Sequence, residues 1–82
     1  MPAHEDPCTM MRRAAEESRQ EIERLKKRIR RLEEDIAALK QRTPPDQAAI
    51  AALEQRLASL QEQLANDELS LSTLEDVISE NC

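Results

Sequence analysis

Large aliphatic residues recur every three or four positions through the first half of the chain. The core positions of a heptad repeat are filled there by Ile22, Leu25, Ile29, Leu32, Ile36 and Leu39. Such a repeat is typical of an amphipathic helix that packs along a narrow seam. The frame extends back through smaller residues to Cys8, so we expect a first helix over residues 7–42.

A Pro-Pro turn interrupts this pattern at residues 43–46. Proline lacks the backbone N–H and disfavours helical geometry in the residue before it, so Pro44 and Pro45 end the first helix. Thr43 can cap a second helix, with proline at its first position, and we expect that helix over residues 44–80. Its core positions are again mostly aliphatic: Ile50, Leu53, Leu57, Leu60, Leu64, Asp67, Leu71, Leu74, Ile78 and Asn81.

So short a connection predicts antiparallel neighbours. The core positions of a heptad are its first and fourth residues, called a and d. If facing residues have numbers that add up to about 89, every a position of one helix meets a d position of the other. The same register brings opposite charges together beside the seam, in the pairs Arg12 with Glu75, Arg19 with Glu68, and Asp35 with Arg56.

Asp67 is the polar break in the strong part of this core. A buried, unpaired carboxylate is costly, so either its side chain reaches solvent or the helix is distorted there. The segment Ser72-Thr73-Leu74-Glu75 has the form of a capping box, which begins a helix. A break near residues 66–72, with a short final helix after it, is therefore the main alternative to a continuous second helix.

The composition supports an all-α fold and little catalytic chemistry. The 82 residues include no Gly, Phe, Tyr or Trp, and 35% are charged, which disfavours barrels, sandwiches and pocketed cores. We expect one helical hairpin over residues 1–82 without enzymatic activity, cofactor or metal. His4, Glu5, Asp6 and Cys8 are the one cluster of metal-ligand types, and we interpret residues 1–6 as a short polar lead-in.

Charge divides unevenly between the two halves. Residues 1–43 carry 11 Lys/Arg and 9 Asp/Glu, whereas residues 44–82 carry 1 and 8. A basic cluster without an acid lies in the first half, namely Arg24, Lys26, Lys27, Arg28, Arg30 and Arg31. It is predicted to face a protein partner or, as the alternative, a polyanion such as nucleic acid. The net charge of −5 and the absence of aromatic residues favour the protein partner.

Two helices with one narrow seam bury little, so we expect a covalent staple or self-association. Cys8 and Cys82 are the two cysteines, and the predicted register places them together at the open end of the hairpin. We predict a disulfide between them, with free thiols as the alternative. No signal peptide or membrane-spanning run is recognisable, so a cytoplasmic location is the default, and an oxidising compartment is expected if the cysteines are bridged.

Small residues near the turn predict where a second molecule docks. Alanine allows another helix to approach closely, and the chain has alanines off the seam at Ala37, Ala38, Ala48, Ala49, Ala51 and Ala52. We expect a homodimer on this oligomer face, in the form of a four-helix bundle. The expected function is therefore a coiled-coil protein–protein interaction, scaffold or oligomerisation module that does not enter membranes.

Overall fold

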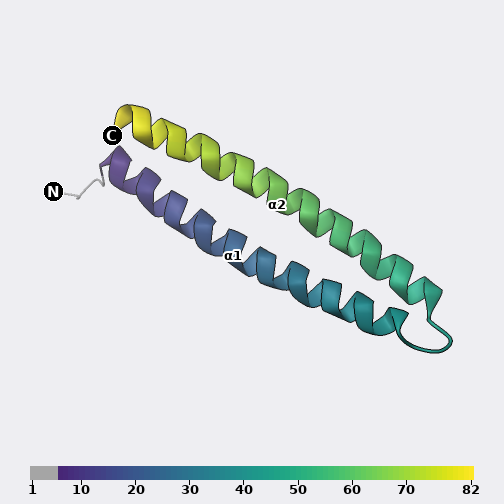
Figure 1. Cartoon of the computed structure of the whole chain (residues 1–82). Helices are drawn as coiled ribbons and strands as arrows, with labels where there is room; N and C mark the ends of the chain where they lie inside the picture. Colours follow the sequence, from purple (N-terminus) through teal and green to yellow (C-terminus); the bar gives the residue numbers. More distant parts are fainter. Residues whose placement is uncertain (1–5) are drawn as a thin grey trace.

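The computed structural model describes residues 6–82, which form two long helices lying side by side in opposite directions (Figure 1). Helix α1 spans Pro7–Lys40 and helix α2 spans Gln47–Asn81. The predicted all-α helical hairpin is thus confirmed, and the described residues contain no strand. The radius of gyration is 18.7 Å, against about 12 Å for a compact chain of this length. The molecule is a rod of 66 × 25 × 14 Å.

Helix α1 begins where the sequence predicts. Asp6 is the N-cap, and its Oδ1 accepts a hydrogen bond of 3.2 Å from the backbone N–H of Cys8. Pro7 occupies the first turn, where its missing N–H costs no hydrogen bond. The helix ends at Lys40, two residues before the predicted end, and residues 1–5 of the predicted lead-in lie outside the described residues.

Helix α2 begins later than predicted, because Asp46 and not Thr43 caps it. Asp46 Oδ1 accepts a 3.0 Å hydrogen bond from the backbone N–H of Ala49. The predicted start at residue 44 is wrong because Pro45 follows Pro44, and a residue that precedes proline is held out of helical geometry. The helix can therefore start only after Pro45, and the turn includes a cis Thr43–Pro44 bond.

Helix α2 is continuous from Gln47 to Asn81, and the alternative of a break near residues 66–72 is absent. Thr73 does not cap a new helix. Its Oγ1 donates a 3.1 Å hydrogen bond to the carbonyl oxygen of Leu69, one turn earlier in the same helix. Asp67 is only partly buried, so its carboxylate is not deprived of water and the helix is not forced to distort.

Burial is unequal along the seam. On α1 the seam residues are buried, namely Ala15, Ile22, Leu25, Ile29, Leu32 and Ile36, whereas on α2 only Ile50 is. Leu32, Ile36 and Ile50 form the core cluster near the turn, with Leu39, Leu53, Leu57 and Leu60 packed against it. The remaining α2 seam residues stay half-exposed: Leu64, Leu71, Leu74 and Ile78. The α2 side of the seam is therefore incompletely covered.

The ion pairs that cross between the helices differ from those predicted. Arg19 pairs with Glu75 at 3.1 Å and not with Glu68, and Lys40 lies 4.0 Å from Glu54. In both pairs the residue numbers add up to 94, whereas those of the bonded Cys8 and Cys82 add up to 90. Helical side chains lean toward the N-terminus of their own helix. In antiparallel helices, two long side chains therefore meet when each residue lies slightly C-terminal to the level where the backbones face each other. This shift makes the sum of the two residue numbers larger.

We expect replacement of a seam residue to destabilise the hairpin. Leu32→Ala removes a buried side chain and should lower the free energy of unfolding by about 2–4 kcal/mol, with Ile29→Val costing about 1 kcal/mol. Leu69→Ala is the control, because Leu69 is 68% exposed, and it should change stability by less than about 0.5 kcal/mol. Urea unfolding followed by circular dichroism measures all three, and an equal effect of Leu32→Ala and Leu69→Ala would contradict this seam.

Candidate functional site

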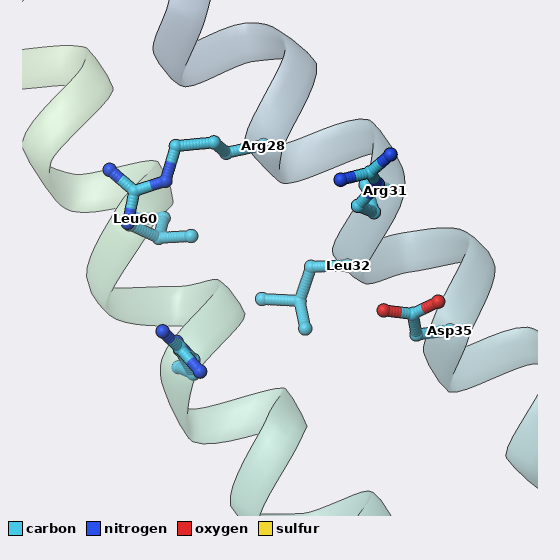
Figure 2. Close-up of a pocket in the computed structure, with 6 residues that line it drawn as sticks. Arg28, Arg31, Leu32, Asp35 and Leu60 are labelled. Atoms are coloured by element: carbon cyan, nitrogen blue, oxygen red, sulfur yellow. The ribbon is translucent and has the colours of Figure 1, made fainter.

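A groove of about 280 Å³ lies along one edge of the seam, in the half of the rod nearer the turn. Arg28, Arg31, Leu32 and Asp35 of α1 line it, together with Arg56 and Leu60 of α2. Figure 2 shows the Arg28 side chain extending from α1 toward α2 beside Leu60, while Leu32 points into the space between the helices. The groove therefore has an apolar floor with charged groups at its rim.

The groove carries excess positive charge. Three guanidinium groups, those of Arg28, Arg31 and Arg56, share it with the one carboxylate of Asp35. Within residues 6–82, none of these four side chains takes part in an ion pair within 4.0 Å. The predicted pair of Asp35 with Arg56 thus lies at one groove without direct contact. Guanidinium groups in this state can bind carboxylates or phosphates from another molecule.

The opposite edge of the seam is already bridged. Arg19 and Lys40 of α1 reach across it to Glu75 and Glu54 of α2. Hydrogen bonds to Glu75 first, and then to Glu16, raise the pKa of Arg19 above its ordinary value. We call the bridged side the paired edge and the side with Arg28, Arg31 and Arg56 the open edge. Among the described residues, every cross-helix ion pair lies on the paired edge.

The predicted basic cluster does not lie on one face. Because successive residues of a helix are about 100° apart, its six members surround α1. Arg28 and Arg31 reach the open-edge groove, Lys26 pairs with Glu23 at 3.7 Å, and Arg24 pairs with Glu21. Lys27 and Arg30 are exposed elsewhere on α1. Two of the six basic residues therefore line the open-edge groove, and the other four do not.

Arg56 belongs to this site although it was not among the predicted site residues. It lies 25 positions or more from the α1 arginines, so no local motif connects it with them. The signal that could have found it is its isolation, since it is the one basic residue in positions 44–82. Arg56 is level with basic residues of the other helix, so it indicates a site shared by several cations and not a salt bridge.

The alanines predicted as an oligomer face lie on the surface near the turn. Five of them are exposed and Ala49 is half-buried: Ala37, Ala38, Ala48, Ala49, Ala51 and Ala52. Larger apolar side chains are exposed farther from the turn, namely Met10 at 55%, Leu69 at 68% and Val77 at 39%. The exposed apolar surface therefore consists of small side chains near the turn and larger ones farther from it.

The cysteines meet at the open end of the hairpin, as predicted. The sulfur atoms of Cys8 and Cys82 lie 2.09 Å apart, at disulfide distance, and their Cα atoms are 5.9 Å apart. A bond there closes almost the whole chain into one loop, with a sequence separation of 74. Closure of so long a loop restricts the unfolded chain strongly, which supplies the staple that a single seam lacks.

Two further features were sought among residues 6–82. No group of three or more His, Cys, Asp or Glu side chains is placed to hold a metal ion, and His4 and Glu5 of the predicted ligand-type cluster lie outside this range. Neither α1 nor α2 contains a stretch that is both long and apolar enough to cross a membrane.

Comparison of the chain with protein-family models, curated proteins and solved structures found no match. The surfaces of the chain that can contact other molecules are the open edge, the paired edge and the two ends of the rod.

We predict that the disulfide stabilises the hairpin measurably. In the chain-entropy model, closing a loop of about 75 residues is worth about 4.5 kcal/mol. The double variant Cys8→Ser, Cys82→Ser should therefore unfold at markedly lower urea concentration than the oxidised protein. Reduced wild-type protein should behave like the variant, which separates the bond from the substitutions.

Mass spectrometry under non-reducing conditions checks the bond itself. The oxidised monomer should be lighter than the reduced monomer by two hydrogen atoms. Two alkylatable thiols in the oxidised, purified protein would refute the bond.

Proposed function

We propose that this chain is a non-enzymatic coiled-coil module for protein–protein interaction that self-associates as a homodimer and serves as a scaffold. The observation that carries the proposal is the unequal burial of the seam. The apolar stripe of α2 remains half-exposed over most of its length, from Leu53 to Ile78, while that of α1 is buried from Ile22 to Ile36. A partner helix lying along α2 would remove this apolar surface from water.

The shape of the rod suits such a partner. The two helices have nearly equal length, 34 and 35 residues, so a second hairpin can lie against them without overhang and complete a four-helix bundle. The alanines near the turn allow close helix approach at that end, as small residues do in packed helix pairs. Their exposure in the single hairpin leaves them available for this contact.

We expect size-exclusion chromatography with light scattering to report twice the monomer mass of 9.4 kDa. The dimer should persist in reductant, because helix packing and not an intermolecular disulfide would hold it. Dilution should then release monomer, as expected for non-covalent association. A monomer mass at every accessible concentration, with and without reductant, would refute self-association.

A second candidate function is polyanion binding through Arg24, Lys26, Lys27, Arg28, Arg30 and Arg31. The observation that favours it is the groove in which Arg28, Arg31 and Arg56 face solvent without ion pairs in the described part of the chain. Phosphate groups are suitable ligands for such guanidinium groups. The net charge of −5 and the lack of aromatic residues weigh against nucleic acid as the natural ligand.

The polyanion candidate predicts binding to short DNA and RNA oligonucleotides at about 50 mM salt, weakening steeply as salt rises. The triple variant Lys27→Glu, Arg28→Glu, Arg31→Glu should abolish it. A control with the same change in net charge, Arg12→Glu, Arg13→Glu, Arg42→Glu, should retain most of it. Fluorescence anisotropy measures the affinity, and the absence of wild-type binding at the lowest salt would eliminate this candidate.

A further inference from the structure

One stripe of α1, on the open edge, has a charge pattern that is complementary to itself when reversed. The stripe follows the three- and four-residue spacing of a single helix face through Met10, Ala14, Glu17, Glu21, Arg24, Arg28, Arg31, Asp35 and Ala38. Its first half is acidic, with Glu17 and Glu21, and its second half is mainly basic, with Arg24, Arg28 and Arg31. The one acid of the second half is Asp35, which reversal places opposite uncharged Ala14. An antiparallel copy of the same stripe would therefore face it with opposite charges.

We propose that a second copy of this chain docks on the open edge about a two-fold axis, so that Glu17 and Glu21 of each copy face Arg31 and Arg28 of the other. This inference rests on the proposed self-association and specifies its surface. In such a two-fold interface every contact occurs twice, so the two acidic and two basic side chains of each copy give four facing pairs. Charge complementarity of this kind sets orientation and register.

The axis crosses α1 beside Arg24, because Glu17 and Arg31 lie equally far from it along the helix. Arg24 already pairs with Glu21 in its own chain, so the two copies of Arg24 near the axis do not meet as bare charges. The ends of the stripe agree as well. Met10, which is 55% exposed, would lie against exposed Ala38 of the second copy, a large apolar side chain against a small one.

Helix α2 fits the same axis, which crosses it near Leu64 and Ala65 at the level of Arg24. The α2 stripe on the open edge includes the groove residue Arg56 and has almost no other charge. It consists of Ala49, Ala52, Arg56, Ser59, Gln63, Asn66, Ser70, Thr73, Val77 and Glu80. The two-fold places Val77 opposite Ala52, and Ser70 opposite Ser59. The acids at Glu54, Glu68 and Glu75 lie on the paired edge or beside it, away from this contact.

The parallel arrangement of two hairpins matches fewer charges, because Asp35 of one copy with Arg56 of the other is the one opposite-charge pair that it brings level on this edge. It would set Arg28 and Arg31 of α1 against uncharged Gln63 and Ser59 of the second copy, at the same level of the rod. The antiparallel arrangement also overlaps the rods over nearly their full length, since the axis lies near the middle of both helices. The contact face would then be on the order of 1,000 Å² for each copy, which is the size of a stable protein–protein interface.

A charge-swap experiment tests this surface with the full-length oxidised chain. Arg28→Glu, Arg31→Glu leaves Arg24 as the one base of the stripe, and Glu17→Lys, Glu21→Lys leaves Asp35 as its one acid. Each variant alone should raise the dimer dissociation constant by roughly tenfold or more, because like charges then face each other. An equimolar mixture of the two should restore dimerisation, because every facing pair is again opposite. Light scattering gives the masses, and circular dichroism checks that each variant is helical.

A matched control changes the charge equally but on a different face of α1. Lys27→Glu, Arg30→Glu alters two exposed members of the same basic cluster that do not line the groove. It should leave the dissociation constant unchanged, as should addition of an oligonucleotide to the wild-type dimer.

The outcomes separate the two proposals. A monomeric wild-type chain refutes self-association and this surface together. A wild-type dimer that survives Arg28→Glu, Arg31→Glu, or a mixture of helical variants that stays monomeric, refutes this surface and leaves self-association standing. Loss of the dimer in the control, or its displacement by oligonucleotide, also overturns the assignment of the open edge to a second copy.

Discussion

The single seam between α1 and α2 determines what this molecule can do. Two helices can cover only one stripe of each other, so nearly all charged and small residues remain at the surface. Among the described residues, the core is a row of aliphatic side chains with Leu32, Ile36 and Ile50 as its buried cluster. The grooves lie beside this row, at the surface. Recognition by the outer faces is therefore the chemistry that this architecture favours.

The two edges of the seam are chemically different, although both arise from one heptad pattern. On the paired edge, long basic side chains of α1 reach glutamates of α2 and satisfy charge within the chain. On the open edge, Arg28 and Arg31 meet Arg56, the one base of the acidic half, together with Asp35. In the described part of the chain, these arginines lack ion pairs and lie beside buried Leu32 and partly exposed Leu60. Polar groups around an apolar centre are the usual composition of a protein–protein contact.

Much of the fold could be predicted because each feature depends on local chemistry. The aliphatic repeat, the two prolines and Asp6-Pro7 decide where helices exist, and the shortness of the turn decides that they are antiparallel. The errors concern competition between nearby groups. Asp46 displaced Thr43 as the cap. Thr73 bonds within its helix, which removes the alternative of a new cap there. The ion pairs differ from those predicted because side chains lean toward the N-terminus of their helix, which the backbone register alone does not include. Arg56 was missed because its neighbours in the groove come from the other helix.

The meeting of Cys8 and Cys82 gives the rod two unlike poles (Figure 1). One pole holds both ends of the helical segment, and the other holds only the Pro-Pro turn. Any segment joined beyond residue 82, or before residue 6, would leave from the same pole, while the turn pole stays bare. A two-fold antiparallel pair of such rods would carry its attachments at opposite ends. The length of the hairpin would then set the distance between the segments that are joined to its two copies.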